Sequence, residues 1–266
     1  MNRIREKFLD LKKKRGKALI FYMTAGDPSL AANQALIPFL EKEGADLIEL
    51  GVPFSDPLAD GPVIQAASQR ALKRGTTLPK ILTLVRNVRK KSQIPVLLMS
   101  YLNPLMQYGY ERFAKDAKAA GVDGVIVPDL PPEEERVFVR ALKGKKLDLV
   151  YLLAPTTGPA RRRVIAKASS GFIYYVSVTG VTGARRQISP SLRPDLSAAK
   201  KASRLPLCVG FGIATPGQAK AAAAGADGVI IGSALVRALE KNSKMSHGLF
   251  AKKFAAPFAR ALGKAV

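Results

Sequence analysis

The segment AGADGVIIGS, residues 224–233, combines a glycine, a small residue, an aspartate and a run of aliphatic residues. Two more segments repeat this pattern, EGADLIEL at 43–50 and AGVDGVIVPD at 120–129. A glycine suits the end of a helix, and a short aliphatic run suits a strand that is buried on both faces. Each segment therefore predicts the same step, in which a helix ends, the chain turns and a parallel strand begins.

Five other apolar runs fit the role of such a strand, which brings the expected number of strands to eight. They are ALIFYM (18–23), IPVLLMSY (94–101), LDLVYLL (147–153), FIYYVSV (172–178) and LPLCVG (205–210). Helical patterns lie between them, and eight alternations of strand and helix predict a (β/α)8 TIM barrel. The alternative is an open, doubly wound sheet. A chain of 266 residues has the length of one such barrel, so we expect a single domain over residues 1–266.

Helix starts can also be placed from the sequence. Ile4, Phe8 and Leu11 fall on one helical stripe, which predicts a short extra helix at the N-terminus. Ser29 precedes a helical pattern and is a candidate N-cap. The stretch PPEEERVFVRALKG, residues 131–144, predicts a helix with three glutamates in its first turn, where the helix dipole favours negative charge.

The charge balance is strongly basic, with 43 Lys and Arg against 20 Asp and Glu and a formal net charge of +23. Such a charge favours polyanions as partners in general. However, the basic residues are scattered, Trp is absent, and aromatic residues are not interleaved with the basic runs as a stacking surface requires. We therefore interpret the charge as a basic surface. A nucleic-acid-binding barrel without catalysis is the alternative.

The single cysteine, Cys208, lies in an apolar run, so it is expected to be a buried packing residue. One cysteine excludes an internal disulfide and suits a reducing cytoplasm. No apolar run approaches the roughly 18 residues that span a bilayer, and the N-terminus has no signal-peptide pattern. These features predict a cytoplasmic protein that makes no membrane contact.

Three carboxylates, Glu49, Asp56 and Asp60, gather in the stretch ELGVPFSDPLADGP, residues 49–62. Barrels of this type place their chemistry at the carboxyl ends of the strands. Glu49 ends the second strand and is expected to point into an apolar mouth, which would raise its pKa and suit it to proton transfer. The alternative for Glu49 is a carboxylate neutralised by a buried Lys or Arg. The alternative for Asp60 is a helix N-cap.

Glycines gather at the ends of the sixth, seventh and eighth strands. Glycine lets backbone N–H groups approach an anion closely, and the start of a helix adds a favourable dipole. Ser233 stands where the helical stretch SALVRALEK begins, so its N–H and hydroxyl could both donate. The ends of the last two strands are the usual phosphate site of this barrel type. The glycines concerned are Gly180, Gly183, Gly210, Gly212 and Gly232.

Histidine chemistry is absent from the predicted strand ends. The only histidine, His247, lies in the tail segment KNSKMSHGLF, far in sequence from every strand end, where a surface or capping role is expected. A Ser-His-Asp triad and a His-rich metal site therefore lack their residue, and we expect no metal.

The motifs together resemble the tryptophan synthase alpha subunit family. ELGVPFSDPLADGPVIQ is similar to that family's signature. FYMTAGDP, LLMSYLNP, VPDLPPEE, VSVTGVTGA, VGFGIATP and GVIIGSALV match the family in the same order, over essentially the whole chain. The first motif is the specific one, because two prolines and three acids recur at fixed spacing. The glycine motifs are shared by many phosphate-binding barrels.

The resemblance implies a lyase that cleaves indole-3-glycerol phosphate to indole and glyceraldehyde 3-phosphate. It also implies a partner, the PLP-dependent beta subunit, in an alpha2-beta2 heterotetramer of L-tryptophan biosynthesis, with indole passing to the partner through a tunnel. The alpha subunit itself is expected to need no cofactor. Two alternatives stay open beside this reading: a stand-alone indole-glycerol phosphate lyase, and another phosphate-binding barrel of indole or histidine biosynthesis.

The resemblance also implies roles for particular residues. The family's two catalytic acids fall on Glu49 and Asp60, a tyrosine near the site falls on Tyr174, and a mobile loop falls around Thr182. Its phosphate site falls on Gly183, Gly212, Gly232 and Ser233.

Two more groups of residues are candidates from their positions in the sequence. Tyr101 and Asp129, at the ends of the third and fourth predicted strands, are expected to contact the substrate. The loop between Pro53 and Pro57 is expected to dock the partner around Asp56, because two prolines keep a loop stiff and reduce the entropy lost on binding.

Overall fold

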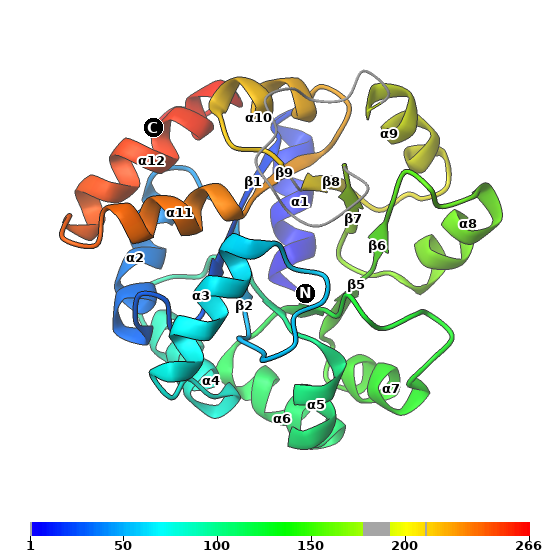
Figure 1. Cartoon of the computed structure of the whole chain (residues 1–266). Coiled ribbons are helices and arrows are strands. Elements are labelled where there is room, and N and C mark those ends of the chain that lie inside the picture. Colours follow the sequence, from blue (N-terminus) through cyan, green and yellow to red (C-terminus); the bar gives the residue numbers. More distant parts are fainter. Residues whose placement is uncertain (1, 178–191, 211) are drawn as a thin grey trace.

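The computed structural model describes residues 2–177, 192–210 and 212–266. Within them, nine parallel strands form one sheet in the order β5-β4-β3-β2-β1-β9-β8-β7-β6. The strands at the two ends of this order, β5 (Asp148–Val150) and β6 (Leu152–Leu153), are separated in sequence only by Tyr151. The chain thus closes the sheet into a barrel at Tyr151, and a ring of helices surrounds it (Figure 1). The predicted TIM barrel is confirmed, with its fifth strand split in two.

The other strands are short and buried. Each is about as long as the apolar run that predicts it, or shorter. They are β1 (Ala18–Thr24), β2 (Leu47–Gly51), β3 (Val96–Met99), β4 (Gly124–Ile126), β7 (Ile173–Val176), β8 (Leu207–Gly210) and β9 (Gly228–Ile231). The pairing of β1 with β2 sets Tyr22 beside Glu49, and the pairing of β2 with β3 sets Glu49 beside Leu97. Tyr22 and Glu49 therefore lie at one level of the barrel.

The helices pack their apolar faces on the outside of the barrel and enclose the larger part of the core. Outside the N-terminal helix they are α2 (Leu30–Lys42), α3 (Pro62–Lys73), α4 (Leu78–Val88), α5 (Leu102–Tyr108), α6 (Tyr110–Ala120), α7 (Arg136–Gly144), α8 (Pro159–Ala168), α9 (Leu192–Lys201), α10 (Pro216–Ala223), α11 (Ser233–Lys241) and α12 (His247–Ala261). Ser29 caps α2 as expected, since its hydroxyl accepts from the N–H of Ala32 at 3.1 Å. No helix in the described part of the chain is long and apolar enough to cross a membrane.

The predicted position of three glutamates in the first turn of α7 is wrong. The helix begins only at Arg136, and the glutamates precede it. Glu135 has a φ of 47°, a left-handed conformation that a right-handed helix cannot include. Glu134 donates its N–H to Pro131 in a turn at 3.1 Å, and Glu133 forms an ion pair with Arg161. Local turn geometry and an ion pair therefore outweigh the preference of glutamate for a helix start.

The aspartates of the three repeated segments have one structural task, which is to tie neighbouring strands together where they begin. The Oδ2 of Asp46 accepts from the N–H of Leu19 at 2.8 Å, at the start of β1. In the same way Asp123 Oδ2 accepts from Val96 at 2.9 Å, and Asp227 Oδ2 accepts from Leu207 at 2.9 Å. Each of the three also pairs with a basic side chain. The repeated sequence pattern thus corresponds to a repeated hydrogen bond that braces the starts of two neighbouring strands.

The N-terminal helix α1 (Arg3–Lys13) lies across the middle of the ring of strands (Figure 1). Its buried residues Ile4, Phe8 and Leu11 are those expected from the sequence. They pack against side chains inside the barrel, among them Phe172, just before β7, and Cys208 of β8. Cys208 is fully buried, as predicted.

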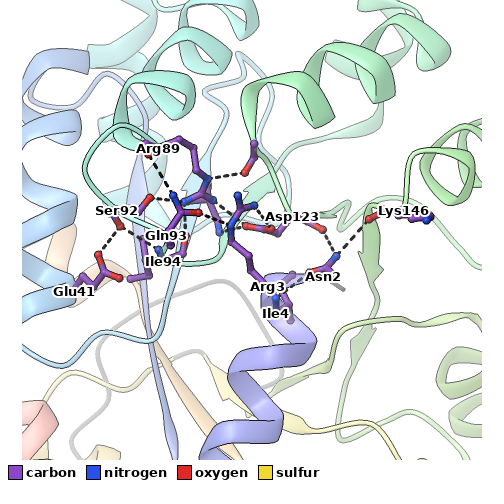
Figure 2. A network of polar contacts seen from close by, with 12 residues as sticks. Asn2, Arg3, Ile4, Glu41, Arg89, Ser92, Gln93, Ile94, Asp123 and Lys146 are labelled. Carbon is purple, nitrogen blue, oxygen red and sulfur yellow. Dashed lines mark hydrogen bonds and ion pairs between the residues drawn. The ribbon is translucent and has the colours of Figure 1, made fainter.

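Polar contacts fix the start of α1 to the barrel (Figure 2). The side-chain amide of Asn2 donates to the carbonyl of Asp123 at 2.8 Å. The carboxylate of Asp123 binds Arg3 and Arg89, each at 2.9 Å. Asp123 is only 3% exposed, so both guanidinium groups meet a carboxylate that water barely reaches. The orientation of α1 is therefore set by a buried polar network as well as by its apolar face.

Candidate active site

Glu49 lies near the carboxyl end of β2 with its side chain inside the barrel. It is 1% exposed, and neither carboxylate oxygen has a hydrogen-bond partner among the described residues. Burial without a compensating partner disfavours the charged form and raises the pKa of Glu49 to about 8. The raised pKa expected from the sequence is confirmed, and among the described residues no Lys or Arg neutralises this carboxyl.

Asp60 lies at the end of the loop that follows β2, directly before the N-cap residue of α3. Gly61 occupies the N-cap position and Pro62 begins the helix, so Asp60 does not cap α3. The side chain is 6% exposed. Burial raises the pKa of Asp60 to about 6, although a hydrogen bond from Tyr101 opposes the shift. At neutral pH this carboxyl is mainly ionised, whereas that of Glu49 is mainly protonated.

Tyr101 connects the loop that carries Asp60 to the end of β3. Its hydroxyl donates to Asp60 Oδ2 at 3.2 Å and accepts from the N–H of Ala59 at 2.9 Å. Its ring lies against that of Phe54, with centroids 5.4 Å apart. The structure thus places Tyr101, expected to contact the substrate, in direct contact with Asp60, where it holds the orientation of the carboxylate.

Two buried tyrosines, Tyr22 of β1 and Tyr174 of β7, complete the wall around the carboxyls. A Cβ on Gly51 would come within 2.1 Å of the Tyr22 hydroxyl, and one on Gly210 within 2.2 Å of the Tyr174 hydroxyl. Each ring therefore needs a glycine on the neighbouring strand. The Tyr22 hydroxyl lies 3.3 Å from Thr24 Oγ1.

Tyr22 is the functional candidate that sequence reasoning missed. A hydroxyl-bearing residue two positions before the end of the first strand is the only local signal for it. Burial is the main reason why the pKa of Tyr22 is raised, and the neighbouring Asp60 and Glu49 raise it further, so the hydroxyl keeps its proton. Tyr174 likewise has a raised pKa, first through burial and then through Glu49.

One cavity brings together both carboxyls, both tyrosines and part of the glycine group. Its lining in the described residues is Tyr22, Glu49, Asp60, Ile64, Met99, Tyr174, Gly212, Ile213, Ile230, Gly232 and Ser233. Ile64, Met99 and Ile230 supply apolar walls. The lining therefore combines apolar side chains with the two carboxyls, the two tyrosines and the glycine end.

The glycine end of the cavity has the geometry of an anion site. Ser233 is the first residue of α11, with Gly232 at its N-cap, so the positive end of the helix dipole faces the cavity. Gly212 has a φ of 75°, which favours glycine. Two further candidates, Gly183 of the phosphate group and Thr182 of the loop, lie outside the described residues.

Asp129 and the proline loop lie away from this cavity. Asp129 is exposed, and its carboxylate accepts from the N–H of Leu102 at 3.0 and 3.2 Å, at the start of α5. In the proline loop, Pro53 is buried and Asp56 is exposed. Leu58, which sequence reasoning did not single out, is 78% exposed. The exposed tip of this loop thus combines a carboxylate with an apolar side chain.

The part of the chain that the structure describes contains no group of three or more His, Cys, Asp or Glu side chains that could hold a metal ion. His247 is the first residue of α12 and does not line the cavity.

Comparison with known proteins gives a consistent result over the full length. Residues 8–261 match the family described as "Tryptophan synthase alpha chain". The tryptophan synthase alpha chain of Geobacter sulfurreducens is 51% identical over 263 residues, covering 99% of this chain and 100% of the relative. That of Geotalea uraniireducens is 56% identical over 241 residues, covering 91% and 90%.

Solved structures agree with these sequence relatives. The tryptophan synthase subunit alpha of Legionella pneumophila superposes with a TM-score of 0.91 at 41% identity, over 99% of both chains. A chain of Mycobacterium tuberculosis tryptophan synthase gives a TM-score of 0.89 at 36% identity, over 98% of both chains.

Proposed function

The chain belongs to the tryptophan synthase alpha chain family, and we propose that Glu49 and Asp60 are the two groups that carry its chemistry. The family reaction is a lyase step of tryptophan biosynthesis, in which indole-3-glycerol phosphate is cleaved. The products are indole and glyceraldehyde 3-phosphate. The observation that supports the assignment of residues is the pair of buried carboxyls on one cavity, with pKa values of about 8 and about 6.

Cleavage of the bond between indole C3 and the side chain is a retro-aldol step. Glu49, protonated at neutral pH, gives its proton to C3, and positive charge develops on the ring nitrogen. The carbon–carbon bond then breaks, its electron pair returns to the indole ring, and the adjacent hydroxyl becomes the aldehyde carbonyl. The proton of that hydroxyl goes to the Glu49 carboxylate, which restores the starting state. One carboxyl that both gives and takes a proton thus balances the reaction.

Asp60 is the second participant in this proposal. Its ionised carboxylate accepts a hydrogen bond from the indole N–H and stabilises the positive charge that develops there. Tyr101 keeps the carboxylate in place, because its hydroxyl bonds to Asp60 and to the loop N–H of Ala59 together. Asp129 supports this arrangement indirectly, because its carboxylate accepts from the N–H of Leu102, the residue after Tyr101. None of these steps requires a metal or an organic cofactor in this chain.

The substrate phosphate occupies the glycine end of the cavity in this proposal. The backbone N–H groups around Gly212, Gly232 and Ser233 would donate to its oxygens, with Gly183 as a further donor. Tyr174 borders the space for the rest of the substrate. The loop that the family resemblance expects around Thr182 lies outside the described residues. Holding the phosphate at one end of the cavity sets C3 of the indole opposite Glu49. Proton transfer then takes place between groups that are already positioned in one complex.

Substitution of the two carboxyls tests the proposal. Glu49→Gln keeps the shape of the side chain but cannot transfer a proton, so kcat for indole release should fall on the order of 10²-fold or more, with KM nearly unchanged. Asp60→Asn removes the negative charge and should also lower kcat strongly. Thermal midpoints are measured on the same preparations. A well-folded Glu49→Gln protein with near wild-type kcat would contradict the proposal.

Membership of the family also implies a beta-subunit partner. We propose an alpha2-beta2 heterotetramer in the cytoplasm, with PLP held by the beta subunit and the exposed tip of the proline loop at the contact. Pro53 is buried and anchors the loop, Pro57 stiffens it, and Asp56 and Leu58 face outward. A stiff loop with one charged and one apolar side chain loses little entropy when it docks.

A titration with beta subunit tests this contact. Asp56→Ala should leave intrinsic cleavage mostly intact and reduce the stimulation of cleavage by the partner. Glu43→Ala, which changes a carboxylate at the end of β2 opposite the loop, serves as the control and should leave stimulation unchanged. Full stimulation of the Asp56→Ala protein would remove Asp56 from the proposed contact.

A further inference from the structure

A second hollow lies at the opposite end of the barrel, where the strands begin. It has a volume of about 710 Å³. Its walls come from α1, from the carboxyl-terminal ends of α7 and α8, and from the segment before β8. We call it the basal groove. The packed interior of the barrel, including Phe8 and Phe172, separates it from the cavity that holds Glu49.

Positive charge dominates the rim of the basal groove. Its basic residues are Arg5, Lys12, Lys143, Lys146, Lys167 and Arg204. None of them forms a salt bridge with another described residue, although several other basic side chains of the chain do. Asp148 is the one carboxylate in the described lining. Cations that converge on one concave site attract an anion, and these six have no salt-bridge partner among the described residues.

The floor and one wall of the groove are apolar. Leu9 is 45% exposed although it belongs to a helix whose opposite face is buried in the barrel. Phe8, Leu142 and Leu205 lie in the same lining. An exposed apolar surface inside a hollow of this volume is typical of a site for a small molecule with an apolar body.

Asp148 differs from the aspartates at the starts of other strands. Its Oδ2 is buried and has no hydrogen-bond partner among the described residues, whereas Asp46, Asp123 and Asp227 each accept from a backbone N–H. Burial also raises the pKa of Asp148, so it opposes an anionic ligand less than an exposed carboxylate would.

The wall formed by α1 is held in place before any ligand arrives. Asn2, which lines the groove, is bonded to the carbonyl of Asp123, and the next residue, Arg3, is paired with the Asp123 carboxylate (Figure 2). A preformed wall reduces the ordering that binding requires.

We propose that the basal groove binds a small aromatic acid. The acid group meets the basic rim, and the flat body lies on Leu9 and Phe8. A hollow of this volume matches a molecule of drug-like size, whereas a duplex nucleic acid would contact only the rim cations. This inference does not rest on the proposed roles of Glu49 and Asp60.

Anilinonaphthalene sulfonate is a suitable probe, because it combines flat apolar rings, a sulfonate and one N–H. Its fluorescence is titrated with the full chain while glycerol phosphate is present to compete at the other cavity. The expected result is one saturable site per chain. Lys143→Glu combined with Lys167→Glu should weaken binding about tenfold or more, since both rim cations become anions. Leu9→Asp should do the same by placing a charge on the floor.

Matched controls separate the groove from the basic surface in general. Lys73→Glu combined with Lys241→Glu makes the same charge change at exposed lysines in the last turns of α3 and α11. Leu249→Asp alters a leucine of α12 that is 46% exposed, against 45% for Leu9. Both controls should bind the probe as the wild type does.

Three results would overturn the inference. Equal losses in the groove variants and their controls would show diffuse binding to the basic surface. Displacement of the probe by glycerol phosphate would place it in the other cavity. Displacement by a short DNA duplex, with duplex binding itself lost in the Lys143→Glu and Lys167→Glu variant, would assign the groove to a polyanion.

Discussion

At the scale of single residues, Glu49 shows how a reactive group costs stability. The barrel holds this carboxyl in its neutral form at pH values where an unfolded chain would ionise it, because its pKa is about 8 in the fold against an ordinary value of 4.5. Between these two values the folded protein binds more protons than the unfolded one. Linkage then requires that stability falls as the pH rises through this window.

This cost can be measured with Glu49→Gln, which does not titrate. Relative to the wild type, the variant should gain stability from pH 5 to pH 8, by about 3.5 kcal/mol in total, with a slope that reaches about 1.4 kcal/mol per pH unit only between the two pKa values. The free energy of unfolding is determined by denaturant titration of both proteins at the two pH values. The same difference at pH 5 and pH 8 would show that Glu49 has an ordinary pKa in the folded protein.

Individual site residues differ in how far the sequence predicts them. Glu49 stands out because an acid near the end of an apolar strand is unusual, and Asp60 because it follows in the same acidic, proline-rich stretch; the structure brings both to one cavity. Tyr22 could not be recognised, because its importance depends on its register with Glu49 on the next strand and on the missing Cβ of Gly51. The position of Asp129 likewise depends on a bond to Leu102 that sequence spacing does not reveal.

At the scale of elements, α1 is held by the buried network around Asp123. Asp123→Ala should destabilise the protein by about 3–5 kcal/mol, because it leaves the Arg89 guanidinium in a site that is 10% exposed without its carboxylate. Asp10→Ala is the control, since the Asp10–Lys14 pair is largely exposed and its loss should have only a small effect. Denaturant titration of both variants measures the difference. Equal, small losses would show that α1 is held by its apolar face alone.

Helix starts illustrate the limits of local sequence patterns. Ser29 caps α2 because its hydroxyl needs only the N–H groups of its own helix. The glutamates before α7 are positioned by contacts outside their own helix, since Glu133 pairs with Arg161 of α8. Prediction therefore succeeds where the determining contact is local and fails where it is tertiary.

At the scale of the whole molecule, the repeated Gly-x-Asp step predicts the barrel because each repeat encodes one strand start and its brace. Closure through a fifth strand split at Tyr151 needs the pairing of both ends of the sheet, which sequence alone does not give. The barrel separates two kinds of site. Buried carboxyls gather where strands end, and unpaired cations surround the hollow where they begin.

The central claim is that a protonated Glu49 and an ionised Asp60 act together, and the pH dependence of kcat/KM for indole release tests it most directly. The rate should fall as the pH drops through about 6, where Asp60 gains a proton, and as it rises through about 8, where Glu49 loses one. The alkaline limb is the decisive part, because a phosphate group titrates near 6 and not near 8. A rate that stays constant or rises through pH 8 would contradict the account.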